Sequence, residues 1–168
     1  RRNTIDRSEY AKYHCKRGLR NEDGTGVLVG LTEIGEVHGY IVDEGERVPI
    51  DGQLYYRGIN VYDIVTGFET DGRFGFEETA YLLLFGALPN HEELAEFTDI
   101  LGSKRELADG FTENMVLRAP SPDIMNKIAR SVLVAYSYDD NPEEPTARNI
   151  VRQSVELIAR FPTFAAYA

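Results

Sequence analysis

The chain has 168 residues, of which 42% are hydrophobic and 27% charged, and its net charge at pH 7 is −10. This length suits one domain, and this composition is typical of globular rather than disordered proteins. The acidic excess argues against a nucleic-acid partner, since a phosphate backbone selects the opposite charge. No apolar run approaches the roughly 20 residues of a membrane-spanning helix, so we expect no membrane partner.

Residues 1–26 are predicted to be a basic N-terminal arm. Residues 1–20 carry a net charge of +5, which leaves −15 for the rest of the chain. Thr4 to Lys16 could form a short amphipathic helix, and a polar Gly-rich loop follows. The arm would pack as a solvated helix on an acidic surface, or reach a phosphorylated ligand. Cys15 is the single cysteine, which excludes an internal disulfide, fits a reducing compartment and predicts a cytoplasmic protein.

Residues 27–59 are predicted to form a small antiparallel β element. β-rich pieces at 27–34, 37–42 and 54–56 are separated by Gly35, by the turn 43–46 and by Asp51-Gly52. An Asp-Gly pair between β-rich pieces is a good hairpin signal, so we expect a turn at that pair.

Residues 60–168 are predicted to be helical. A short helix from Asn60 should stop near Gly67. The segment 76–85 is apolar almost all round, which predicts a helix that is buried on most faces. Asn90, followed three residues later by Glu93, is an Asn-led version of a capping box and should start a helix that runs to about Lys104.

Two more helices are predicted in the last third of the chain. The first runs from Asp123 to Tyr138, and its inward stripe is expected to be Ile124, Ile128, Val132 and Ala135, flanked by Met125, Ala129 and Leu133. The second runs from about Thr146 to Arg160, with Ile150, Val151, Ser154, Val155 and Ile158 inward. Pro162 should end it, and Thr163 would cap a new helix well. The fold class is therefore mainly α, with a small N-terminal antiparallel β element.

The residues alone reveal no active site. His14, His38 and His91 are scattered, and none is paired with another His or Cys at metal-ligand spacing, so we expect no metal site. The acidic turn 139–144 lacks the ligand order of a calcium loop and reads as a solvated connection. No Ser/His/acid nucleophile arrangement is supported either.

Arg57 is the candidate binding residue that the local sequence suggests. It follows two aromatic residues at a predicted strand end and precedes a helical segment. A guanidinium there could bind a substrate carboxylate or phosphate through two hydrogen bonds. It could equally bond buried carbonyls and hold the β element against the helices.

Three segments resemble the citrate synthase family. Leu54-Tyr55-Tyr56-Arg57-Gly58 is similar to the family's Leu-x-Tyr-Arg-Gly strand end. Residues 76–89 (FEETAYLLLFGALP) are similar to its Phe-Glu-Glu-x-Ala-Tyr-Leu-Leu-Leu-x-Gly-x-Leu-Pro helix. Residues 157–167 (LIARFPTFAAY) match its Leu-Ile-Ala-x-x-Pro-Thr-x-Ala-Ala-Tyr segment. These matches keep the family's order, from about Leu28 to the C-terminus.

The resemblance implies a multi-helical fold and an acyltransferase of the tricarboxylic acid cycle. Such an enzyme condenses acetyl-CoA, its co-substrate, with oxaloacetate to citrate and CoA, binds no cofactor tightly, and forms homodimers through helical surfaces. The family's catalytic His, His and Asp lie in its second half and have no counterpart here. The resemblance therefore implies an N-terminal fragment, divided as 1–26, 27–59 and 60–168, without catalytic residues and inactive alone.

The resemblance also implies binding roles. Arg57 is a candidate for substrate, and Arg17 and Arg20 are candidates for the CoA phosphates, although no local motif selects either one. The chain departs from the family at Ser121-Pro122-Asp123, where many members carry a His-Pro-Met tract, and in a longer stretch 36–53. Two alternatives stay open: a 2-methylcitrate synthase that uses propionyl-CoA, and a non-catalytic helical interaction module.

Overall fold

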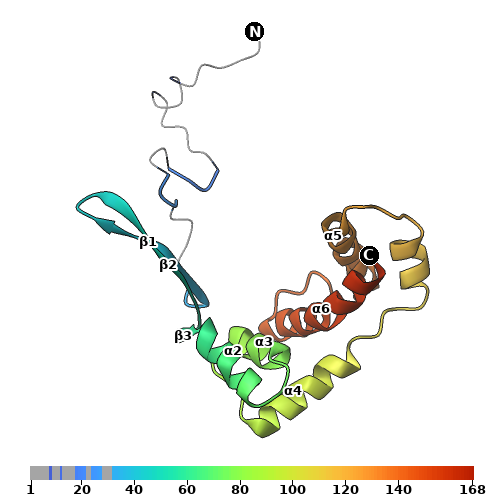
Figure 1. Cartoon of the computed structure of the whole chain (residues 1–168). Helices are drawn as coiled ribbons and strands as arrows, with labels where there is room; N and C mark the ends of the chain where they lie inside the picture. Colours follow the sequence, from blue (N-terminus) through green and yellow to red (C-terminus); the bar gives the residue numbers. More distant parts are fainter. Residues whose placement is uncertain (1–7, 9–11, 13–17, 22–23, 28–31) are drawn as a thin grey trace. The chain divides into compact units, whose positions relative to one another are not determined.

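The computed structural model describes residues 8, 12, 18–21, 24–27 and 32–168 (Figure 1). The chain divides into two compact units, Arg1–Val61 and Tyr62–Ala168. The predicted helix Thr4–Lys16, with Cys15 and the candidate Arg17, lies outside the described residues apart from two isolated positions.

The first unit contains a three-stranded antiparallel sheet. Its strands are β1 (Gly35–Asp43), β2 (Glu46–Tyr56) and β3 (Ile59–Asn60), in the order β1-β2-β3. Glu44 and Gly45 connect β1 to β2 and both have positive φ, 48° and 85°. Two such residues form the tight turn whose twist matches that of a β-hairpin.

The turn expected at Asp51-Gly52 is wrong, because both residues lie inside β2. The pairing jumps there from His38 opposite Gln53 to Tyr40 opposite Pro49, so three residues of β2 face one residue of β1. The Asp-Gly pair thus marks a bulge, and the neighbouring Glu-Gly pair makes the turn. The expected β piece 27–34 is also not a strand at its described positions, 27 and 32–34.

The second unit is helical. Its elements are α2 (Val61–Thr70, which begins at the last residue of the first unit), α3 (Phe76–Phe85), α4 (His91–Ser103), the π-helical η1 (Thr112–Leu117), α5 (Ile124–Ala135), the 3₁₀ turn η2 (Tyr136–Tyr138) and α6 (Ala147–Tyr167). α6 packs against α4 and α5, and α3 packs against α4. The predicted mainly α class agrees with this arrangement.

The α3 and α4 predictions are confirmed. α3 has the predicted bounds, and α4 begins after Asn90, whose Oδ1 accepts hydrogen bonds from the backbone N–H groups of Glu92 and Glu93, both at 2.9 Å. The Glu93 carboxylate accepts the Asn90 N–H at 2.8 Å, which completes the capping box. The expected deep burial of α3 is wrong, since only Leu82 is buried on it.

Two predicted helix ends are wrong. α2 continues through Gly67 to Thr70, because a glycine within a helix costs only about 1 kcal/mol. α6 continues through Pro162 to Tyr167, so Thr163 lies within this helix and caps no new one. Proline removes one helix hydrogen bond, and the burial of Phe164 two residues later helps to hold the helix together.

The helical unit has two apolar clusters. Phe97 and Leu101 of α4 meet Val155 and Ala159 of α6 in the first. The second cluster consists of Phe111, Val116 and Phe164, with Val132 and Ala135 packed against it.

The expected inward stripe of α5 is correct only in part. Lys127 and Ser131 are its buried residues, whereas Met125 and Leu133 are each 75% exposed and Ile124 is also exposed. On α6, Val155 is buried as expected, but Ile150 and Val151 are exposed. Val132 and Ala135 of the predicted stripe do pack against the second cluster, but the most deeply buried positions of α5 are the polar residues Lys127 and Ser131.

Candidate functional site

Arg57 occupies a tight turn between β2 and β3. Arg57 and Gly58 form a two-residue connection, because Tyr56 pairs with Ile59 across it, and both have positive φ, 50° and 80°. The Arg57 N–H donates to the carbonyl of Ile34 at 2.9 Å. The backbone of Arg57 therefore connects β2 to β3 and bonds the residue before β1, whereas both roles of its guanidinium stay predictions.

Arg20 lies in a small loop that also contacts the hairpin. Its backbone pairs with Gly26 in an isolated antiparallel β-bridge, and its Nη1 lies 3.4 Å from the carbonyl oxygen of Gly24. Arg47 donates to the same carbonyl at 3.0 Å, and its guanidinium lies 4.2 Å from the ring centre of Tyr40. Arg47 was not among the predicted site residues, although its position beside the turn that follows β1 could have indicated it. Arg17 lies outside the described residues.

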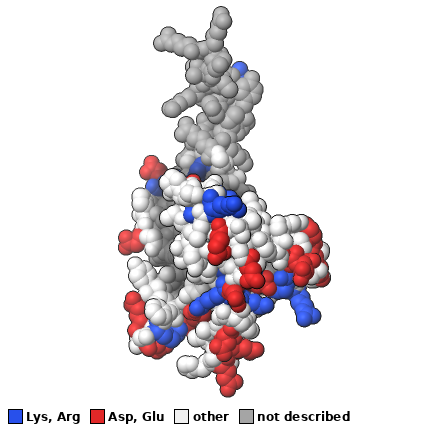
Figure 2. Space-filling model, turned by 90° about the vertical axis from the view of Figure 1, so that its right-hand side faces the viewer, with Lys and Arg blue, Asp and Glu red and all other residues white. Residues whose placement is uncertain are grey.

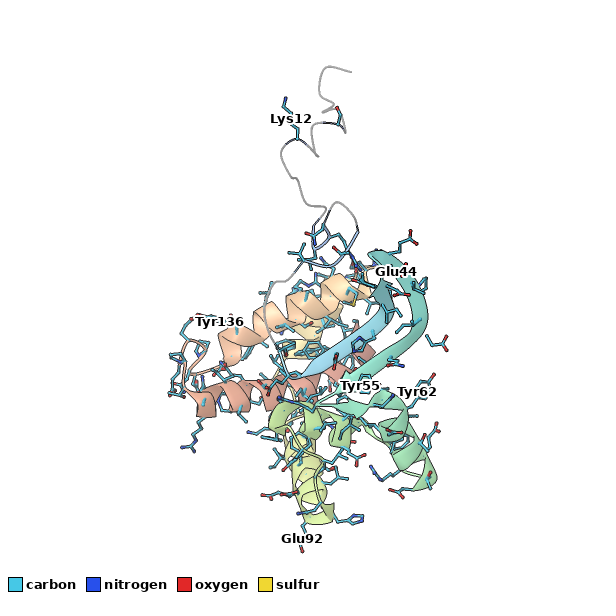
Figure 3. All side chains as sticks on the ribbon, turned by 90° about the vertical axis from the view of Figure 1, so that its left-hand side faces the viewer. Lys12, Glu44, Tyr55, Tyr62, Glu92 and Tyr136 are labelled. Atoms are coloured by element: carbon cyan, nitrogen blue, oxygen red, sulfur yellow. The ribbon has the colours of Figure 1, made fainter. Side chains whose placement is uncertain are left out.

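The histidines do not form a common site in the described part of the chain. His38 of β1 is hydrogen-bonded to Glu36 at 2.7 Å and meets the edge of the Tyr55 ring, labelled in Figure 3. His91 is exposed at the start of α4, in the other unit. Among the described residues, no group of three or more His, Cys, Asp or Glu side chains is placed to hold a metal ion.

A cluster of polar side chains joins the end of α5 to α6. Arg152 Nη2 donates to both oxygens of Asp139, at 2.7 and 2.8 Å. Gln153 donates to Asp139 Oδ2 at 2.9 Å, and the Asn141 N–H to Oδ1 at 2.9 Å. The hydrogen bond from Gln153, then those from the Asn141 N–H and Arg152, hold the pKa of Asp139 below its ordinary value.

Side chains of α6 also hold the loop that connects α5 to α6. Asn149 Nδ2 donates to the carbonyl oxygens of Asn141 and Glu144, at 2.8 and 3.0 Å. Tyr136, labelled in Figure 3, donates its hydroxyl to Glu143 at 2.5 Å, and this bond raises the pKa of the phenol. The acidic turn is the solvated interhelix connection that was predicted, with Asp140, Glu143 and Glu144 exposed, and it is in addition anchored by these hydrogen bonds.

The charges in this region compensate one another. Glu156 lies between Arg152, Arg160 and Lys104, with N–O distances of 3.3, 3.5 and 3.7 Å. Figure 2 shows acidic and basic side chains intermixed on the side of the molecule that it presents. A set of paired carboxylates and guanidiniums clamps helices together, and it provides no free base or nucleophile for covalent chemistry.

The sequence carried a signal for this clamp. Asn149, Arg152, Gln153 and Glu156 recur at helical spacing along one side of α6 and follow the N-cap Thr146. The acidic turn, taken by itself, gives no sign of its pairing with this polar face.

The comparisons with known proteins agree on one family. Residues 21–168 match the family model described as "Citrate synthase, C-terminal domain". A citrate synthase of Haloferax volcanii is 31% identical over 140 residues, which is 79% of this chain and 35% of that protein. A 2-methylcitrate synthase of Mycobacterium tuberculosis is 30% identical over 155 residues, which is 90% of this chain and 33% of that protein.

The fold of the chain is similar to that of a solved citrate synthase. The crystal structure of a citrate synthase from Pyrobaculum aerophilum superposes with a TM-score of 0.63 and 21% identity, over 89% of this chain and 37% of that one. The chain thus spans about a third of the length of these relatives. Among the described residues, no helix is long and apolar enough to cross a membrane.

Proposed function

Because the chain belongs to the citrate synthase family, we propose that it forms part of an acyltransferase that condenses acetyl-CoA with oxaloacetate to citrate and CoA. The observation that supports this most directly is the continuous family match over residues 21–168. The three motif segments support a place in the first half of the enzyme. The matched model is described as the C-terminal domain, so this placement is part of the proposal.

The contribution of these residues is scaffold and surface rather than catalysis. Condensation needs a base for the thioester methyl proton, groups that polarise two carbonyls, and cations for the carboxylates. The described carboxylates Asp139 and Glu156 are already paired with arginines. His38 and His91 lie in separate units. The catalytic groups are therefore expected outside these residues.

The binding roles are part of the same proposal. Arg57 is the candidate for substrate, and Arg17 and Arg20 are the candidates for the CoA phosphates. The intact protein is proposed to be a cytoplasmic homodimer, with no tightly bound cofactor and no metal. The exposed apolar residues of α5, such as Met125 and Leu133, support a dimer surface made of helices.

A 2-methylcitrate synthase is the second candidate. The Mycobacterium tuberculosis protein of that name is 30% identical to this chain, against 31% for the Haloferax volcanii citrate synthase. This difference in sequence identity does not decide between acetyl-CoA and propionyl-CoA as the substrate. An interaction module without catalysis stays the third candidate.

The test is a thiol-release assay with oxaloacetate and either acetyl-CoA or propionyl-CoA. It is run on this chain and on the protein made from the complete reading frame that encodes it. We expect no turnover by the chain alone and turnover by the complete protein, with the preferred thioester separating the two enzyme candidates. Turnover by the chain at the rate of the complete protein would overturn the scaffold role, and silence of both would favour the interaction module.

A further inference from the structure

The hairpin of β1 and β2 has an uncovered aliphatic face. The register places Val37 opposite Leu54 and Ile41 opposite Val48, so these four side chains lie on one face of the sheet. Val37, Ile41 and Val48 are all exposed. The described strands of the first unit form one layer, so none of them covers this face. A two-stranded hairpin is only marginally stable in water by itself, and a partner on its aliphatic face would stabilise it.

The same hairpin is acidic. Residues 35–56 contain five carboxylates and one arginine, which gives them a net charge of −4 with histidine neutral. Asp43 and Glu46 are paired beside the turn, and both belong to the aliphatic face. The single cation, Arg47, belongs to the opposite face, where its guanidinium lies over the ring of Tyr40. The chemistry of the aliphatic face therefore favours a partner that combines apolar side chains with positive charge.

The basic arm of the chain has this combination. Residues 1–20 carry a net charge of +5 and belong to the same compact unit as the hairpin. Ser8 and Lys12 are the described residues of the predicted arm helix, and both are helical and exposed. A helix that exposes these two residues places Tyr10 and Tyr13 together on its other side. Because so short a helix is marginal in water without packing, this aromatic side also needs a partner.

The loop that follows the arm is attached to the hairpin. Arg47 Nη1 donates to the carbonyl oxygen of Gly24 at 3.0 Å, and Arg20 Nη1 lies 3.4 Å from the same oxygen. Arg47 is the second residue of β2, so this attachment lies at the acidic end of the hairpin, close to Asp43 and Glu46. The predicted arm helix is about 20 Å long and the aliphatic face about 13 Å, so the arm is long enough to cover that face.

We propose that the basic arm docks on the aliphatic face of the hairpin of its own chain. Tyr10 and Tyr13 pack on the aliphatic side chains, and Arg17 lies at the acidic end, beside Asp43 and Glu46. Each partner then covers apolar surface that the other leaves in water, and opposite charges meet at one end. The docked arm and a CoA phosphate would compete for Arg17, but the docking itself does not depend on the proposed condensation reaction.

The test places a nitroxide spin label at residue 8, on the exposed side of the arm. The variant C15S/S8C gives a single attachment point, because Cys15 is the only cysteine of the chain. A docked arm holds this label near the end of the hairpin that is remote from the turn. We therefore expect strong broadening of the amide NMR signals of Val37 and Leu54. Broadening that is stronger at Glu46 than at Val37 would indicate an arm held only by its loop, and would overturn the proposal.

Two pairs of variants in this background test the contacts. I41E adds a charge to the aliphatic face, and V42E adds the same charge to the opposite face at the next residue, which is also exposed. I41E should lower the ratio of docked to free arm about tenfold or more, because the charge loses water on docking, and V42E should bind the arm like the parent. R17E should release the arm, whereas R17K, which keeps the charge, should retain it. Parent-like broadening in both I41E and R17E would overturn the proposal.

A mixed sample distinguishes docking within one chain from docking between two copies. It contains the spin-labelled chain without isotopes and the isotope-labelled chain without a spin label. We expect no broadening of the hairpin signals in this mixture. Broadening of Val37 and Leu54 there would assign the arm to a second copy and overturn docking within the chain. This measurement and that of the parent need no variant of the hairpin, so the test holds even if I41E fails to fold.

Discussion

At the scale of single residues, the polar contacts of α6 show how a helical scaffold uses charge. Asp139 is an acceptor for Arg152, Gln153 and the Asn141 N–H, and these contacts fix the loop that connects α5 to α6. Because hydrogen bonds of this kind favour the ionised carboxyl group, the pKa of Asp139 lies below its ordinary value of 3.8 in the folded chain.

The first prediction concerns pH and D139N. A carboxyl group with a depressed folded pKa stabilises the fold above its unfolded pKa, and that stability is lost as the pH falls through the folded pKa. D139N should therefore lower the free energy of unfolding at pH 7, and the difference from the parent should shrink below about pH 4. Urea unfolding of both proteins at a series of pH values measures this difference. The contributions of the other carboxyl groups cancel in this difference. A difference that grows as the pH falls would contradict the lowered pKa of Asp139.

At the scale of elements, α6 carries the connections of the helical unit. It contributes Val155 and Ala159 to one cluster and Phe164 to the other. Pro162 lies inside this helix, between these contacts. The proline removes the N–H that would pair with the carbonyl of Ile158, so the helix is weakened where the two clusters adjoin.

The second prediction is that P162A stabilises the chain. Alanine restores the helix hydrogen bond, worth up to about 3 kcal/mol in a helix interior. The loss of proline's stiffness in the unfolded chain takes back about 0.4–1 kcal/mol, so we expect a net gain of about 1–2 kcal/mol. The urea midpoint of the chain should rise, whereas A165P, a proline at an exposed position of the last turn, should lower it. A lower midpoint for P162A would mean that the proline ring is needed for packing in the cavity that it lines beside Leu101.

Elements with local signals were predictable from the sequence, and those decided by packing were not. The Asn90 and Glu93 capping box defines the start of α4 within four residues, so its position follows from sequence alone. The hairpin turn at 43–46 was predicted, but Asp51-Gly52 suits a turn equally well, and only the strand register shows that this second pair lies inside β2.

Packing between segments that are distant in the sequence also explains the errors on α5 and at the candidate site. Lys127 is buried although it is charged, because its Nζ reaches the carbonyl oxygens of Tyr167 and Ala168. Asp139 and Arg152 meet only after the chain has turned back. Neither contact has a local sequence pattern, so periodicity placed the helices and part of their packed faces but not these polar partners.

At the scale of the molecule, the helical unit leaves a large apolar surface exposed. Met125, Ala129 and Leu133 of α5 and Tyr136 of η2 follow one another at helical spacing and are all exposed. Soluble monomers rarely expose a contiguous apolar patch of more than a few hundred Å². These exposed residues make this stripe the part of the proposed dimer surface that a substitution can test.

The last prediction tests whether this face of α5 mediates self-association. L133E places a charge at an exposed position, so the free energy of unfolding should change by no more than about 0.5 kcal/mol. If the face is buried between two copies, the same charge loses water without gaining a partner, and the dissociation constant should rise about tenfold or more. Sedimentation over a range of concentrations measures the association, and A95E adds the same charge at an exposed position of α4 and should have no effect. A parent chain that stays monomeric at high concentration and binds no hydrophobic dye would contradict the role of this surface. Equal association of L133E and the parent would instead place the contact on another helix.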